Sequence, residues 1–137
     1  MADAFMAEIR MVAFNFAPHG WATCDGQLLP LMQNQALFSL LGTTYGGDGQ
    51  STFALPDFRS RGPIHQGQGL GLSQRDLGEK GGAEAGHLPS ARTEIPQTPD
   101  NPTILTYVPG MQPTIDNMQP FLVVSFIISL AGQFPVR

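Results

Sequence analysis

The chain is 137 residues long and 42% hydrophobic, which suits a single domain with a substantial core. Only 13% of its residues are charged, the net charge is −4, and the basic residues are one lysine and six arginines. So few basic residues argue against nucleic-acid binding, because phosphate binding needs clustered cations. A surface so poor in charge favours an oligomer over a free monomer. The 16 glycines and 12 prolines predict a turn-rich chain with few long helices.

Two short strands are predicted near the amino terminus. Residues 8–16 carry apolar side chains typical of a strand that runs from a sheet edge into the core. Residues 21–24 form the second strand, and the dipeptide Asp25-Gly26 after it predicts a tight hairpin turn. Because Cys24 is the only cysteine, no intrachain disulfide can form. We interpret it as a buried thiol that acts as a small apolar side chain beside Trp21.

A helix and a glycine-rich turn system are predicted next. Residues 33–41 place apolar side chains at helical spacing, so we expect a helix that begins after an Asn34 cap and ends at Gly42. Residues 42–61 contain four glycines in eight positions, followed by a short β-prone run that Pro56 stops. Because glycine adopts positive φ without steric cost, this segment is typical of a compact turn system.

The glycine-rich segment and its neighbours supply the positions that we expect to define the fold. Arg59 and Arg61 are expected to pair with Asp57, Asp48 or carbonyl groups of the glycine loop. The predicted structural positions are Trp21, Cys24, Asp25, Gly26, Phe38, Gly42, Tyr45, Gly46, Gly47, Asp48, Gly49, Phe53, Leu55, Pro56, Asp57, Arg59 and Arg61. Those expected to share one core are Trp21, Phe38, Tyr45, Phe53, Leu55 and Phe58.

Four blocks in this order resemble a known family. They are residues 20–27, 35–41, 42–61, and the ending that runs from 117–121 to 132–137. The sequence resembles the phage tail collar family and, within it, the bacterial proteins named microcystin-dependent. Phage members of the family sit in tail fibres that attach a virion to a host surface. The resemblance therefore implies a structural, adhesive protein.

One motif of the family is missing. Members commonly carry a Met-Pro-x-His-x-His motif, whose imidazoles can hold a metal ion around a trimer axis. Residues 88–93 read Leu-Pro-Ser-Ala-Arg-Thr here, and neither Ala91 nor Thr93 can replace an imidazole ligand. His87 stands alone before them and is interpreted as a surface or capping residue. We predict no metal site and no cofactor; a calcium ion held by carbonyls of the glycine loop is the alternative.

Beyond Arg61 the composition shifts toward glycine and proline. Residues 62–72 have glycine at alternate positions near their end and predict an ordered loop held by its neighbours. Prolines punctuate residues 93–120, which predicts an extended arm in which only residues 103–108 are strand-like.

The longest apolar run is residues 121–131, which predicts a strand buried on both faces in a sheet core or a subunit interface. Its eleven residues are too few for a membrane-spanning helix, which needs about 20. The residues predicted to form the interface are Met118, Pro120, Phe121, Val123, Phe126, Ile128 and Phe134.

No catalytic residue is predicted, because the histidines lie far apart in sequence and no nucleophile-elbow motif is present. The alternative to a structural protein is a small hydrolase, or a carbohydrate-binding or carbohydrate-active protein. Its pocket would lie near His19, Asp48 and His65.

Together these patterns predict an α+β fold that is mostly β, with short strands, one short helix near residues 33–41 and long Gly/Pro-rich loops. The predicted parts are a collar-like module (1–62), a loop or distal tip (63–116) and a carboxyl-terminal strand (117–137) that completes the core or an interface. The predicted function is a self-assembling tail-fibre or bacterial surface-fibre protein.

Such a protein would form a trimer or fibre and attach to a cell-surface glycan or protein receptor. We expect it on the virion or outside the cell, and in the cytoplasm before assembly. The first ten residues contain acidic side chains and lack a basic segment before an apolar core, so we expect no Sec-type signal peptide.

Overall fold

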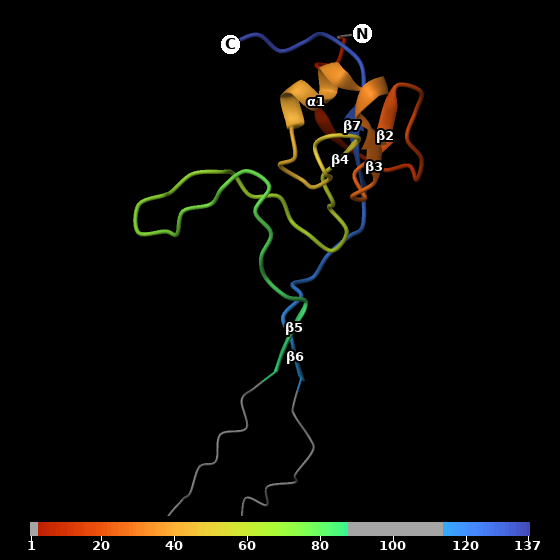
Figure 1. Ribbon diagram of the computed structural model, residues 1–137. Helices are drawn as coiled ribbons and strands as arrows, with labels where there is room; N and C mark the ends of the chain where they lie inside the picture. The colour runs from red at the N-terminus through yellow and green to blue at the C-terminus, as the bar shows by residue number, and fades with distance from the viewer. Residues whose placement is uncertain (1–2, 88–113) are drawn as a thin grey trace, which may run out of the picture. The chain divides into compact units, whose positions relative to one another are not determined.

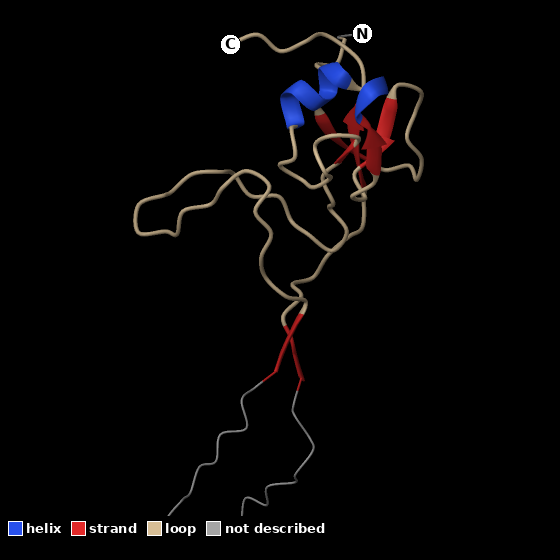
Figure 2. Cartoon of the chain, viewed as in Figure 1, coloured by secondary structure: helices blue, strands red, loops and turns tan. Residues whose placement is uncertain are grey.

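The computed structural model describes residues 3–87 and 114–137. Contacts divide the chain into one unit of Met1–Lys80 with Leu122–Arg137 and a second unit of Gly81–Phe121. The boundaries expected after residues 62 and 116 stay a prediction. The described residues form short strands, one short α-helix and one 3-10 helix, as Figures 1 and 2 show, which confirms the mostly β fold class.

The elements of the first unit follow the chain in this order: β1 (Ile9–Val12), β2 (Trp21–Thr23), β3 (Leu28–Pro30), the 3-10 helix η1 (Leu31–Gln33), α1 (Gln35–Leu41), β4 (Thr52–Ala54) and β7 (Ser125–Ser129). In the second unit, β5 (Ala85–His87) pairs antiparallel with β6 (Thr114–Asp116). The strand expected at residues 103–108 and the segment 88–93 lie outside the described residues.

The carboxyl-terminal strand β7 is the centre of a three-stranded antiparallel sheet with the order β1-β7-β2. Ile9 lies opposite Ile128 on one side, and Trp21 lies opposite Ser129 on the other. Ile127 and Ile128 are 3% and 0% exposed, and successive strand residues point to opposite faces, so both faces of β7 are covered. The strand predicted within residues 121–131 is thus shorter than expected, and residues 121–124 before it are exposed.

The hairpin turn predicted at Asp25-Gly26 is wrong. After β2 the chain passes into a second sheet, in which β3 pairs with β4 and Leu29 lies opposite Phe53. Cys24 is the crossing point: its N–H donates to the Phe126 carbonyl at 2.9 Å, and its own carbonyl accepts from the Phe58 N–H at 2.9 Å. Gly26 has a positive φ of 76°, and its N–H donates to the Pro56 carbonyl at 3.2 Å instead of closing a hairpin.

Helix α1 begins and ends at residues close to the predicted ones, but one predicted cap is wrong. The Asn34 side chain makes no cap hydrogen bond and donates instead to the Pro30 carbonyl at 2.9 Å. Gly42 ends the helix with φ 55°, and its N–H donates to the Phe38 carbonyl at 2.7 Å. Within the described ranges, no helix is long and hydrophobic enough to cross a membrane.

The first strand is also shorter than the predicted residues 8–16. A bend at residues 13–16 ends β1, and a bulge precedes it. Ala7 has φ 68° and donates to the Ser129 carbonyl at 3.0 Å, while Ser129 donates to the Glu8 carbonyl at 2.9 Å. Ala7 and Glu8 thus both lie opposite Ser129 of β7. This is a G1 β-bulge in which alanine occupies the position that is usually glycine.

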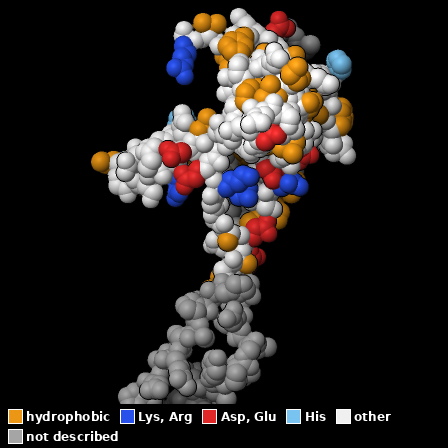
Figure 3. Space-filling view, in the orientation of Figure 1, with side chains coloured by type: hydrophobic (Ala, Val, Ile, Leu, Met, Phe, Trp, Pro, Cys, Tyr) orange, Lys and Arg blue, Asp and Glu red, His pale blue; other side chains and the backbone are white. Residues whose placement is uncertain are grey.

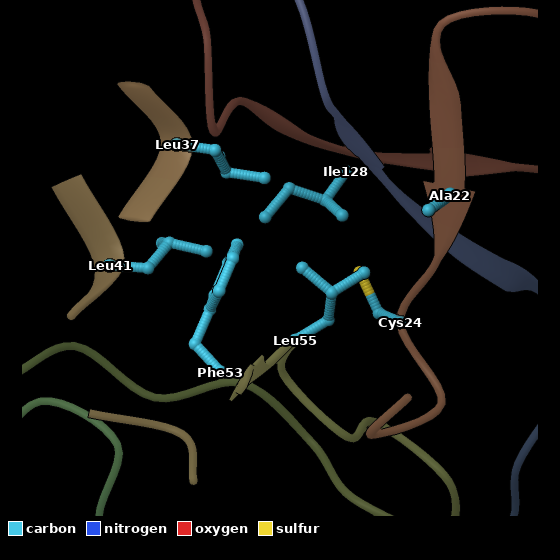
Figure 4. Packing of buried hydrophobic residues seen from close by; sticks show 7 residues of the cluster. All are labelled: Ala22, Cys24, Leu37, Leu41, Phe53, Leu55 and Ile128. Atoms are coloured by element: carbon cyan, nitrogen blue, oxygen red, sulfur yellow. The ribbon is translucent and has the colours of Figure 1, made fainter. Parts of the chain in front are cut away.

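The two short sheets and α1 enclose one buried cluster. Figure 4 shows Leu37 and Leu41 from α1 directed toward Phe53, Leu55 and Ile128. Ala22 and Cys24 complete the cluster. Half-buried aromatic side chains pack around it, namely Phe38, Tyr45, Phe58 and Phe126.

Trp21 is the exception to the predicted core. It is half-buried and lies outside the cluster, because Ala22 points into the core and the next residue along a strand points to the other face. The Arg10 guanidinium lies over the indole ring, 5.1 Å from the ring centroid. On that face Arg10 also pairs with Glu8, at 2.6 Å between Nε and Oε1.

The two chain ends close the first unit by direct backbone contact. Met6 donates to the Gln133 carbonyl at 3.0 Å, and Gln133 donates to the Ala4 carbonyl at 3.1 Å. Gly132 has φ 140°, and a Cβ atom there would lie 2.1 Å from the Ala4 carbonyl oxygen. Only glycine therefore allows this approach.

We predict that Gly132→Ala lowers the free energy of unfolding by about 1–3 kcal/mol, from the disfavoured backbone conformation and the clash. Urea denaturation with hydrogen exchange should also show lost protection of the Met6 amide. Gly62→Ala is the matched control, because a Cβ atom at Gly62 would have no neighbour within 4 Å and its φ is not positive. Equal stability of the two variants would contradict the account of the closed ends.

Candidate interaction site

The glycine-rich segment is organised around the carboxylate of Asp48. One oxygen, Oδ1, accepts from the N–H groups of Gln50, Ser51 and Thr52, each at 2.9 Å. The other, Oδ2, accepts from the Ser51 hydroxyl at 2.7 Å. The Ser51 hydroxyl first, and then the backbone donors, hold the pKa of this carboxyl well below its ordinary value. Because its carboxylate accepts four hydrogen bonds from its own loop, Asp48 stabilises the turn and is not available as a general base.

The loop also lies closely against β4, and this explains its glycines. The Ala54 N–H donates to the Gly46 carbonyl at 3.1 Å. Gly47 has φ 90°, and a Cβ atom there would lie 2.4 Å from Cα of Phe53. A side chain at this position would push the loop away from the strand whose Phe53 side chain is completely buried. The glycines thus couple the loop to the core.

A second carboxylate organises the chain after β4. The Arg59 guanidinium forms a bidentate ion pair with the Asp57 carboxylate, in which Nε donates to Oδ1 and Nη2 donates to Oδ2, both at 2.9 Å. The Arg59 side chain, followed by its backbone N–H, lowers the pKa of the Asp57 carboxyl. The Arg59 side chain is 72% exposed, so the pair fixes local geometry and contributes little to stability. The side chain of Arg61 is exposed.

The residues considered for chemistry are not assembled for it. Cys24 is buried, and desolvation, with a smaller effect of Asp25, raises the pKa of its thiol to about 12, so the thiolate is scarce at neutral pH. His19 and His65 are exposed on separate loops. In residues 3–87 and 114–137 there is no cluster of three His, Cys, Asp or Glu side chains that could hold a metal ion.

The predicted interface residues divide into covered and exposed ones. Ile128 is completely buried in the chain's own core, and Phe126 stacks on Phe58 with ring centroids 4.4 Å apart. The remaining members are exposed or, for Met118, half-buried: Met118, Pro120, Phe121, Val123 and Phe134. The contacts of Phe126 and Ile128 are therefore intramolecular, and only the exposed members are free to meet a partner.

The first unit has further exposed hydrophobic side chains that the sequence analysis did not select. They include Met11, Phe14 and Phe16 after the start of β1, and Ile64, Leu70, Leu72 and Leu77 in the loop beyond Arg61. Figure 3 shows hydrophobic side chains spread over the face of this unit that is in view. The apolar residues within 8–16 were a usable signal, but they were interpreted as a strand running into the core, because burial is not visible in a sequence.

Part of the chain matches a known protein family. Residues 7–63 match the family model described as the Phage Tail Collar Domain, which spans β1 through β4 and the glycine loop. A comparison with curated proteins finds no match.

We predict that Asp48→Asn destabilises the first unit at neutral pH, since asparagine carries no charge and its amide nitrogen cannot accept from the Ser51 hydroxyl. Because the pKa of Asp48 in the folded state lies below the ordinary 3.8, the ionised carboxylate stabilises the fold at pH values above 3.8. This stabilisation is lost progressively as the pH falls below 3.8. The difference in melting temperature between wild type and variant should therefore shrink from about pH 7 to about pH 2.5.

Asp76→Asn is the control for this experiment, because the side chain of Asp76 accepts only from the Gln74 amide, at 3.3 Å, among the contacts of the described residues. It should leave the melting temperature unchanged at both pH values. A pH-independent effect of Asp48→Asn would show that the charge of the carboxylate plays no part in the loop.

Proposed function

We propose that this chain, which carries a phage tail collar domain at residues 7–63, is a structural protein that assembles with copies of itself into a tail fibre or a bacterial surface fibre and acts in attachment. The family match supports the structural, virion-associated role. The observation that supports assembly is the amount of hydrophobic side chain left exposed by a first unit whose core is already complete. Monomeric proteins rarely expose contiguous apolar patches of large area.

The segment before β7 supports this proposal most directly. Leu122 and Val123 are 89% and 81% exposed, and they lie just before the central strand β7, with no charged residue between them and Ser125. A β-prone, apolar segment in water is a surface for a further chain. We infer that it forms the exposed part of the interface, together with Phe134 at 46% exposure.

In this proposal the assembly is a trimer or a fibre, the receptor is a cell-surface glycan or protein, and the protein acts on the virion or outside the cell. The family branch named microcystin-dependent fits the same role and stays a prediction. The hydrolase alternative has no specific observation in its favour, because the Asp48 carboxylate is engaged by four donors of its own loop.

A deletion of residues 121–137 is not a clean test of the interface, because it removes β7 and with it the pairing of β1 and β2. Loss of assembly in that deletion would follow from unfolding alone. Point substitutions at exposed positions separate the two effects.

We predict that Leu122→Glu/Val123→Glu keeps the wild-type fold but converts the assembled protein to monomer at about 10 µM, because charged side chains cannot be buried unpaired in an apolar contact. Circular dichroism checks the fold, and sedimentation velocity measures the assembly state.

Met32→Glu is the matched control, since Met32 is 77% exposed in η1 and lies outside the proposed interface. It should assemble as wild type does. A wild-type protein that sediments only as monomer would remove the assembly proposal, and an assembled Leu122→Glu/Val123→Glu variant would remove this segment from it.

A further inference from the structure

The loop beyond Arg61 contains a closed, ordered finger, which we define as residues 67–75. Gly67 and Arg75 exchange two backbone hydrogen bonds, of 2.8 and 3.0 Å, and so close its base. At its tip, Leu72 donates to the Gly69 carbonyl at 3.0 Å, and the Gln68 side chain donates to the Leu72 carbonyl at 3.1 Å. In Figure 1 this yellow-green loop stands out from the sheets and helix of its own unit.

The base of the finger is held in place by its neighbours. The Arg75 guanidinium pairs with Glu79 at 2.6 Å, and Glu79 also accepts from the Asp76 N–H at 3.0 Å. Gly78 lies directly against the glycine loop, since a Cβ atom there would be 2.5 Å from the Thr44 carbonyl oxygen. The finger therefore has a defined backbone before any partner binds, and this lowers the entropy cost of binding.

The tip of this finger carries hydrophobic side chains that its own chain does not cover. Leu70 is fully exposed, and Leu72 is 67% exposed. No Asp, Glu, Lys or Arg stands between Gly62 and Gln74, so the tip offers no ionic contact to a charged ligand. Four hydrogen bonds within the finger engage part of its backbone, and its two exposed leucines remain for an apolar partner.

The same unit also exposes three hydrophobic side chains that lie close together in the sequence, Met11, Phe14 and Phe16, which we define as the aromatic patch. Met11 and Phe16 are 68% and 59% exposed, and the rings of Phe14 and Phe16 lie 4.8 Å apart. No Asp, Glu, Lys or Arg stands between Met11 and Cys24. The finger tip and the patch are thus both apolar and both free of these charged side chains, which permits their contact without desolvating an ion.

We propose that the finger of one copy packs on the aromatic patch of a second copy of this chain. The inference rests on the proposed self-assembly and specifies one of the contacts that stabilise it. Each copy donates a finger to one neighbour and receives a finger from another, so the contact is heterologous and generates a ring or a fibre.

The area of the contact favours this repeated arrangement over a pair of chains. Burying a large aliphatic or aromatic side chain removes on the order of 60–120 Å² from water, so five such side chains give about 300–600 Å². A stable two-chain interface buries roughly 1,200–2,000 Å². One finger contact is therefore too small to hold two chains together, so the proposal requires a closed assembly in which every copy makes the contact twice and the segment before β7 adds to the buried area.

Two experiments test the contact on the full chain. In the first, Leu70→Glu/Leu72→Glu should weaken assembly about 100-fold or more in sedimentation equilibrium, from the lost burial of two leucines. Ile64→Glu is the control, because Ile64 is 76% exposed but lies outside the finger, and it should assemble normally.

In the second experiment, chains with Leu70→Cys and chains with Phe16→Cys are mixed and treated with a short bismaleimide. Cross-linked pairs should form in the mixture and not in either variant alone, because a heterologous contact joins two different positions. Ile64→Cys mixed with Phe16→Cys sets the background, and the native Cys24 is buried.

The outcomes separate this inference from the proposed function. Wild-type assembly by the Leu70→Glu/Leu72→Glu variant, or cross-linking no greater than background, would overturn the finger contact while self-assembly stands. A wild-type chain that is only monomeric would overturn both. Cross-linking by Leu70→Cys alone would show a symmetric contact between fingers and would also overturn the proposal.

Discussion

The fold depends on the insertion of β7 between β1 and β2. These two amino-terminal strands do not pair with each other; each forms its ladder with β7, from opposite sides. The family match ends at residue 63, whereas β7 begins at Ser125, so the sheet that contains β1 and β2 is completed by a segment far outside the matched range. The contacts of Gly132 and Gln133 with the amino-terminal residues then keep both chain ends at the same place.

Cys24 connects that sheet to the second one, and the glycine loop depends on this connection. Through its two backbone hydrogen bonds, Cys24 belongs to the β2–β7 ladder on one side and to the chain after β4 on the other. The loop can then lie on β4 only where its residues lack a Cβ atom, as at Gly47. Asp48 completes the turn by satisfying three successive N–H groups. The glycines of this segment are therefore explained by its close packing against β4 and by the turn that Asp48 stabilises.

The chain has few charged residues, and its surface exposes many hydrophobic side chains instead. Its core is a small cluster of seven buried side chains, of which Phe53, Leu55 and Ile128 are completely buried. Many other hydrophobic residues lie on the surface, among them those of the finger, the aromatic patch and the segment before β7. Because hydrophobic surface is stabilised by removal from water, these three regions give self-association a physical basis, and the finger adds a backbone that is already ordered.

Local features were determined by the sequence itself. The helix near residues 33–41, its glycine end and the turn chemistry of residues 42–61 follow from side-chain spacing and from backbone freedom at glycine, which act over a few residues. The partners of each strand were decided by tertiary structure, because pairing depends on contacts between distant segments. For this reason the hairpin at Asp25-Gly26 was wrong and Trp21 lay outside the core. Residues 121–131 are divided into an exposed and a buried part for the same reason. The sequence shows that these residues are apolar, but only the fold determines which of them the chain itself covers.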